Sequence, residues 1–257
     1  MKKIFLFAFL ILAFALAGKS QTSVQGFDTT QFNKQLDIAN HLIEYEFYTQ
    51  LAIDKYSKIP ETFDFEWFSY SDNNIWHSVG GHSKGNTFVI QNHITYDSLL
   101  NISDFEGIPD TTKLNTLGSA FALASSHFQI IRDTSSIYLN SFLVSNPDQT
   151  LSIHFLPAFQ PSGQAIYGCE WEYRFDKSGK TLLNQNSFLN NVTGVWIGQP
   201  RELWLNYRST DKPTVGSIFF ALSFRDYFTR IRIDTQISTS TTAKAVDGSY
   251  SWNHKRK

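Results

Sequence analysis

Two stretches of the chain place apolar residues at the spacing of an amphipathic helix. Between residues 31 and 56 they recur every three or four positions, at Phe32, Leu36, Ala39, Ile43, Phe47 and Leu51. This spacing matches the 3.6-residue helical turn. Asp28 and Gln31 before the stretch form a capping-box pattern, and Asp110 can cap a second helix over 111–127. The sequence therefore predicts a long N-terminal helix and a shorter second helix.

Shorter runs of the β-strand type fill most of the chain between and after these helices. Gly80-Gly81 separates two of these runs and has the composition of a two-residue hairpin turn. Closely spaced strands pair antiparallel, because a parallel crossover needs a dozen residues or more. We therefore predict an α+β fold with a twisted, mainly antiparallel sheet and both helices packed on one face. The predicted strands are 63–70, 75–79, 87–92, 137–144, 151–157, 165–175, 194–197, 202–207, 215–223 and 228–234.

The two ends of the chain have different patterns. Lys2-Lys3 precede an apolar run from Ile4 to Ala17, which ends in small residues before Gly18. This arrangement is typical of a cleaved secretory signal peptide, and the run is shorter than the roughly 20 residues of a membrane span. We therefore expect no membrane anchor after cleavage. The predicted organisation is a signal peptide at 1–17, a flexible leader at 18–27, one globular domain at 28–234 and a disordered, Ser/Thr-rich tail at 235–257.

Composition narrows the class of function. The chain has 22 Lys and Arg against 23 Asp and Glu, and this balance argues against a nucleic-acid-binding surface, which needs concentrated positive charge. Its 23 Phe, 11 Tyr and 6 Trp supply ample core material. The signal peptide predicts export to the periplasm or the medium, in a bacterium, away from nucleotide pools. We therefore expect no cofactor.

Residues 166–175 alternate more regularly than any other stretch. One face carries Tyr167, Cys169, Trp171, Tyr173 and Phe175, and the other carries Ile166, Gly168, Glu170, Glu172 and Arg174. Such alternation indicates one face on the core and the other toward solvent or a cleft. The only cysteine would then lie among aromatic rings, where a thiol has a raised pKa and little reactivity.

Strand 151–157 provides the partner for this strand. Apolar residues face apolar residues when the paired positions sum to an even number, and a sum of 324 places His154 opposite Glu170 and Ser152 opposite Glu172. His154, Glu170 and Glu172 would then share one face, and they are the candidate binding residues. Two interpretations remain open for them: an acid/base or metal-binding cluster, or a solvated sheet face with a weak ion pair.

Two further motifs could carry chemistry. Gly81-His82-Ser83-Lys84-Gly85 resembles the nucleophile elbow of α/β-hydrolases, which implies Ser83 as nucleophile. The elbow needs a helix after the serine, whereas residues 86–90 are β-branched and strand-like, so a hairpin loop is the alternative.

The histidines around Gly80-Gly81 suggest a metal site. With Val79 paired to His82, His77 and His82 lie on one face, and His93 and Asp72 are nearby in sequence. Zinc needs further ligands in defined geometry, and no metal-binding spacing is present, so we expect no metal. We predict an exported, non-catalytic binding or structural domain with an unknown ligand or protein partner. The alternative is an exported hydrolase that uses Ser83 or the His154/Glu170/Glu172 face.

Overall fold

Both helices predicted from the hydrophobic period are present. The computed structural model describes residues 26–56, 65–97, 100–132, 137–158, 163–198, 201–245 and 247–257. Helix α2 spans Thr29–Tyr56, and the Gln31 N–H donates to Asp28 Oδ1 at 2.9 Å. Helix α3 spans Thr111–Arg132, and the Lys113 N–H donates to Asp110 Oδ1 at 2.9 Å. Both aspartates therefore cap a helix as their sequence positions predict.

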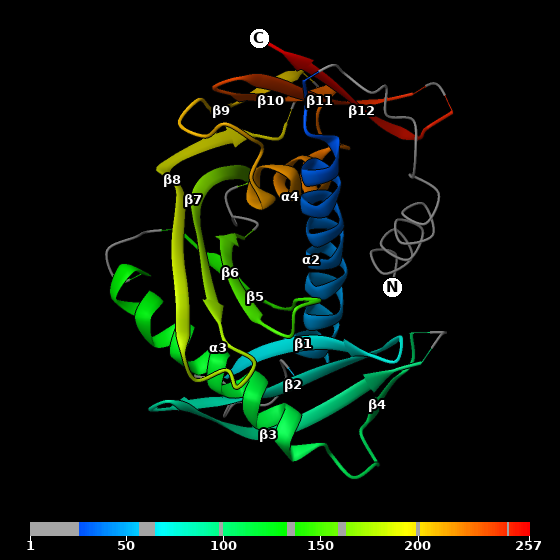
Figure 1. Ribbon diagram of the computed structural model, residues 1–257. Helices are drawn as coiled ribbons and strands as arrows, with labels where there is room; N and C mark the ends of the chain where they lie inside the picture. The colour runs from blue at the N-terminus through cyan, green and yellow to red at the C-terminus, as the bar shows by residue number, and fades with distance from the viewer. Residues whose placement is uncertain are drawn as a thin grey trace. The chain divides into compact units, whose positions relative to one another are not determined.

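The described strands form three four-stranded sheets that are mostly antiparallel (Figure 1). The first sheet has the order β1-β2-β3-β4, the second β5-β6-β7-β8 and the third β12-β11-β10-β9, in which β9 and β10 are parallel. Their bounds are β1 Glu66–Asp72, β2 Ile75–Lys84, β3 Thr87–Tyr96, β4 Ile102–Asp104, β5 Leu139–Ser145, β6 Leu151–Pro157, β7 Gln164–Phe175, β8 Leu182–Trp196, β9 Glu202–Tyr207, β10 Arg230–Thr235, β11 Ser238–Lys244 and β12 Tyr250–Arg256. The α+β class is confirmed, with three sheets where the sequence predicted one.

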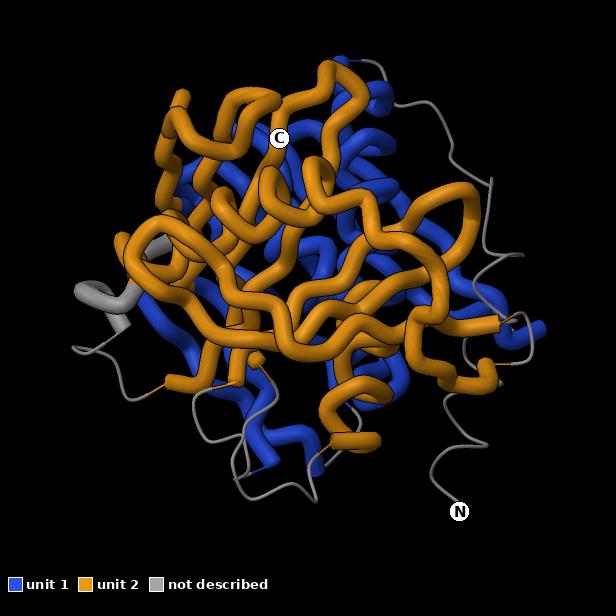
Figure 2. Tube along the Cα trace, turned by 90° about the horizontal axis from the view of Figure 1, so that it is seen from below, with its two compact units in different colours: residues 1–44, 159–168, 188–257 blue, residues 45–158, 169–187 orange. Residues whose placement is uncertain are grey.

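The chain divides into two compact units (Figure 2). Unit 1 comprises residues 1–44, 159–168 and 188–257, and unit 2 comprises residues 45–158 and 169–187. The chain passes between the units within α2, β7 and β8 and after β6. The single globular domain predicted over 28–234 is thus divided between two units, and unit 1 also contains the predicted tail.

In unit 2, side chains from two helices cover opposite faces of the β5–β6–β7 sheet. On one face, Phe128 of α3 stacks on Phe155 with a centroid distance of 4.0 Å. On the other face, Tyr45 of α2 packs on Phe142 with a centroid distance of 5.4 Å. The first six residues of β6 are therefore all buried, although their sequence alternates between apolar and polar.

In unit 1, the β9–β12 sheet has one buried and one exposed face. Leu203, Ile231, Thr242 and Trp252 are paired in one row across the four strands, and all are buried. The first turn of α2 packs on this face, since the rings of Phe32 and Trp252 meet edge to face at 5.1 Å. This packing places the start of α2 beside β12.

Two predicted elements of unit 1 were wrong. Residues 215–223, predicted as a strand, lie in helix α4, Val215–Phe224, which is capped by Thr214. Eight of its ten residues are buried, so the helix has no polar face to reveal its period. The tail predicted to be disordered over 235–257 forms β11 and β12, where Ser238, Ser240 and Thr242 turn inward as small buried side chains.

The predicted turn at Gly80-Gly81 was also wrong. Strand β2 continues through both glycines to Lys84, and the hairpin turn follows at Gly85 with φ +59°. The pairing with β3 shifts by one residue between Gly80 and Gly81, so these glycines mark a β-bulge. An alanine Cβ at Gly81 would lie 2.0 Å from the Val89 carbonyl oxygen. Glycine is thus required here for close backbone approach.

Candidate functional site

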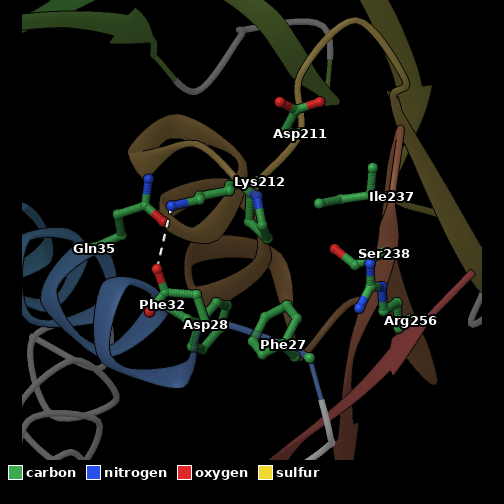
Figure 3. Close-up of a pocket in the computed structure, with 11 residues that line it drawn as sticks. Phe27, Asp28, Phe32, Gln35, Asp211, Lys212, Ile237, Ser238 and Arg256 are labelled. Carbon is green, nitrogen blue, oxygen red and sulfur yellow. Dashed lines mark hydrogen bonds and ion pairs between the residues drawn. The ribbon is translucent and has the colours of Figure 1, made fainter.

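A pocket in unit 1 lies where the start of α2, the loop before α4 and the edge of the β9–β12 sheet meet (Figure 3). Its volume is about 60 Å³, which corresponds to roughly four to six water positions and suits one small organic molecule. It is lined by Gly26, Phe27, Asp28, Phe32, Gln35, Asp211, Lys212, Pro213, Ile237, Ser238 and Arg256.

The segment before α2 forms one wall of this pocket. The Phe27 ring stacks on the His254 ring with a centroid distance of 4.1 Å and an interplanar angle of 11°. Burial lowers the pKa of His254 to about 4, so the imidazole is neutral at pH 7 and offers Phe27 an uncharged face. His254 Nδ1 also lies 2.9 Å from Ser240 Oγ, which fixes the ring.

Gly26 allows Arg256 to lie against the backbone. Its φ is +83°, and an alanine Cβ there would lie 2.5 Å from Arg256 Nη1. Only a residue without a side chain leaves this space for the guanidinium. The glycine therefore leaves room for a cation at the pocket wall.

An ion pair occupies another part of the pocket lining. Lys212 Nζ lies 3.2 Å from Asp28 Oδ2, and the two side chains are 50% and 51% exposed. The Gln31 N–H and the Lys212 ammonium hold the pKa of Asp28 below its ordinary value. This pair is solvated and contributes little stability. Within the pocket lining, however, the charges of Lys212 and Asp28 cancel each other.

Three other polar groups of the pocket remain without a partner among the described residues. Gln35 Oε1 is buried and accepts no hydrogen bond. The Arg256 guanidinium and the Asp211 carboxylate form neither a hydrogen bond nor an ion pair with another described side chain. The pocket thus offers an anionic acceptor, a neutral acceptor and a cationic donor.

The apolar part of the lining complements these groups. Phe27, Phe32, Pro213 and Ile237 contribute rings and aliphatic surface, and Ile237 is 44% exposed. A few converging polar groups within apolar walls are typical of a small-molecule binding site. The arrangement suits binding of a small ligand.

The three predicted site residues lie in unit 2, in a different arrangement from the one expected. The register of β6 and β7 sums to 326, so His154 lies opposite Glu172 and Ser152 opposite Arg174. The predicted pairing of His154 with Glu170 was wrong by two residues, although the shared face was right. Gly168 and Cys169 have positive φ, which shows that β7 is irregular beyond the paired residues.

This face is largely buried instead of solvated. His154 is 5% exposed and Glu170 is 2% exposed, because the second half of α2 covers the sheet. Burial lowers the pKa of His154, and the neighbouring Glu172 carboxylate opposes that shift. Glu172 Oε1 accepts from Ser152 Oγ at 3.2 Å, and Oε2 accepts from Asn186 Nδ2 at 3.3 Å. That this face binds a ligand stays a prediction, and the burial of the face does not favour it.

Ser83 does not lie on a nucleophile elbow. It lies on β2 two residues before the hairpin turn, and β3 follows with no helix. Its Oγ donates to Glu66 Oε2 at 2.5 Å, so its hydroxyl has a carboxylate partner and not a histidine. The strand-to-helix geometry that the motif requires is therefore missing.

The histidine pair predicted beside the glycines is formed by different residues. The predicted pairing of Val79 with His82 was wrong, because His82 pairs with Val89 and Val79 with His93. His77 and His82 therefore belong to the same strand, β2. His77 Nδ1 instead lies 3.0 Å from His93 Nε2. Burial lowers the pKa of both imidazoles, that of His93 to about 4.

Cys169 behaves as its position on the predicted strand indicates. It is free and buried, at 4% exposure. Burial, with a smaller effect of Glu170, raises the pKa of its thiol to about 11. The thiol is therefore a packing group.

Sequence reasoning missed the pocket because its residues are far apart in the chain. Gly26 and Arg256 come from opposite ends, and Asp211 belongs to a loop. The one local signal in the sequence was Gly26-Phe27 before the Asp28 cap, in the segment predicted to be a flexible leader.

Comparisons with protein-family models, curated proteins and solved structures find no match for this chain. Among the helices within the described residues, none is long and apolar enough to cross a membrane. The function must therefore be argued from the geometry of the sites themselves.

Proposed function

We propose that the protein is an exported, non-catalytic binding domain whose unit 1 pocket takes a small zwitterion such as an amino acid. The observation that supports this is a pair of oppositely charged groups in one lining, Arg256 and Asp211, whose side chains have no partner among the described residues. A ligand carboxylate would pair with the guanidinium, and a ligand ammonium would donate to Asp211 and to the buried Gln35 oxygen. The apolar ligand side chain would contact Phe27 and Phe32.

The size and charge of the pocket narrow the class of ligand. A volume of about 60 Å³ suits a small molecule better than an oligosaccharide or a nucleotide. A ligand with only one charged group would leave Arg256 or Asp211 without a partner. Since Lys212 and Asp28 neutralise each other at 3.2 Å, a neutral zwitterion matches the net charge of the lining.

Charge-removing variants test this assignment. We expect a zwitterionic amino acid to bind the wild type in calorimetry. Arg256→Gln should weaken it about 10- to 100-fold, since hydrogen bonds to charged groups contribute roughly 1.5–3 kcal/mol. The methyl ester of the same amino acid should lose affinity for the wild type but lose nothing further in the variant, because the two changes remove one interaction.

Two other variants serve as a control and as a second test of the role of Arg256. Lys255→Gln removes an exposed cation from the same strand at the position next to Arg256, outside the pocket lining, and should bind as the wild type does. Gly26→Ala keeps every charge but displaces the guanidinium, so it should weaken binding in the same direction as Arg256→Gln. The proposal is wrong if no amino acid binds, or if Lys255→Gln and Arg256→Gln weaken binding equally.

Export is a separate part of the proposal, supported by the pattern of residues 1–17. Expression of the full chain in a bacterium should yield periplasmic or secreted protein that begins at Gly18. N-terminal sequencing of the purified protein measures this directly. An intact Met1 in protein confined to the cytosol would contradict export and would leave the pocket assignment unaffected.

A further inference from the structure

A cluster in unit 2, remote in sequence from the pocket residues, brings three metal-binding atoms together on the β1–β3 sheet. His77 Nδ1 lies 3.0 Å from His93 Nε2, and Tyr70 Oη lies 3.4 Å from the same nitrogen. Tyr70 is paired with His77 across β1 and β2, and their rings stack at 4.8 Å with an interplanar angle of 5°. His93 comes from β3. The three strands therefore place an imidazole nitrogen of His77 and the phenol oxygen of Tyr70 within 3.4 Å of His93 Nε2.

We propose that His77, His93 and Tyr70 bind a divalent transition-metal ion, with zinc as the best geometric fit. With Zn–N bonds of about 2.05 Å, nitrogens 3.0 Å apart enclose an angle of about 94° at the metal. With the same bond length, about 2.05 Å, the 3.4 Å separation of Tyr70 Oη and His93 Nε2 corresponds to about 112°. The second angle lies near the tetrahedral value and the first is smaller, so His77 and His93 would have to move apart to admit the ion, and water would complete the coordination.

The surroundings of the cluster fit this assignment. Phe105 stacks on His93 at a centroid distance of 4.4 Å and meets His77 edge to face at 5.6 Å. These contacts hold both rings in place, as a preformed metal site requires. Beside Tyr70, Lys113 forms an ion pair with Asp72 at 3.0 Å, so the nearby cation is compensated.

The described residues satisfy the hydrogen-bonding groups of the cluster only in part. His93 Nδ1 is buried with no partner among them, and it lies on the opposite side of the ring from the proposed ligand atom Nε2, so a metal would leave it unchanged. Only one of the two facing nitrogens can donate to the other, so the pair shares a single hydrogen bond. In the described parts of the chain, no three His, Cys, Asp or Glu side chains form a metal-binding group. The third ligand proposed here is therefore a phenol, and imidazole ligands suit zinc, copper and nickel.

Zinc titration of the full, chelator-stripped chain tests the site. We expect about one zinc per chain in calorimetry, with His77→Gln and His93→Gln each weakening binding at least about 100-fold, since a change in the ligands themselves exceeds the 10- to 100-fold effect of outer partners. Tyr70→Phe keeps the ring and should weaken binding about tenfold. His127→Gln removes an exposed histidine from α3 and should bind zinc as the wild type does.

Cobalt supplies a readout that does not depend on the variants. The wild-type chain with Co²⁺ should show the intense visible absorption of a four-coordinate ion, which remains informative if a histidine variant fails to fold. The proposal is overturned if zinc binds at less than about half an equivalent, if His93→Gln and His127→Gln bind zinc equally, or if bound Co²⁺ has the weak spectrum of six-coordination.

Discussion

Replacing Gly81 with alanine is expected to cost about 3 kcal/mol of stability or more, enough to unfold unit 2 in a marginally stable chain. The added Cβ would lie 2.0 Å from the Val89 carbonyl oxygen and 2.9 Å from a Phe88 ring atom. The nearest atom belongs to the backbone of β3, so no side-chain rotation can relieve the contact. The strands would have to separate at the bulge, which breaks their pairing.

Gly85→Ala is the matched control for this prediction. It lies in the turn of the same hairpin at φ +59°, with open space around its Cβ position. Its cost is the left-handed strain alone, about 1 kcal/mol. Urea unfolding of both variants measures the difference. Equal midpoints for Gly81→Ala and Gly85→Ala would show that β2 and β3 do not approach so closely.

Glu46→Gln is expected to stabilise unit 2 above pH 7 and to remove a pH dependence that the wild type shows. Glu46 lies on α2 and faces β5, where its Oε1 accepts from Asn140 Nδ2 at 2.8 Å. Burial raises the pKa of Glu46 from its ordinary 4.5 to about 7, and the Asn140 hydrogen bond only partly opposes this shift. The folded state therefore holds a proton that the unfolded state releases.

The sign of the effect follows from this difference in proton binding. Below pH 4.5 the carboxyl is protonated in both states and costs nothing. Between pH 4.5 and 7 only the folded state keeps the proton, so the free energy of unfolding falls as pH rises, by about 3 kcal/mol in total. Above pH 7 the loss is complete and constant. Glutamine keeps the hydrogen-bond acceptor and cannot ionise.

Hydrogen exchange of β5 and β6 peptides between pH 4 and 9, corrected for intrinsic exchange rates, measures this stability within unit 2. The wild type should lose protection as pH rises through this range, whereas Glu46→Gln should not. Glu106→Gln, at an exposed position, should follow the wild type. A Glu46→Gln profile that follows the wild type would show that the carboxyl is solvated.

The helices and their caps were predictable because those signals are local. Asp28 and Asp110 each accept from a backbone N–H three residues ahead, so the sequence spacing specifies the contact. The prediction of a strand at α4 was wrong because its sequence lacks such a local signal of period. Its run from Val215 to Phe224 is buried on nearly every side, and a continuous apolar run does not distinguish a strand from a helix. The Thr214 cap, which accepts from the Ser217 N–H at 3.0 Å, was the signal that could have identified it.

The pairing of β6 with β7 shows which part of the strand register the sequence determines and which part it leaves to the tertiary structure. The alternation of apolar residues correctly placed His154 and Glu172 on the same face, but a slip of two residues preserves that alternation. The hydrophobic pattern therefore determines the parity of the register and leaves its offset open. For the same reason, composition did not show that Ser240 would be buried in a sheet between β10 and β12.

By itself, the sequence determined the two long helices, their caps, the shared face of His154 and Glu172 and the buried state of Cys169. Those features depend on residues within a few positions of one another or on a two-residue period. The tertiary structure alone decided that α2 covers the His154 face, that Arg256 meets Gly26 and that His77 meets His93. Such contacts depend on which strands and helices pack together across long separations in the chain. The spacing of residues in the sequence does not specify that packing.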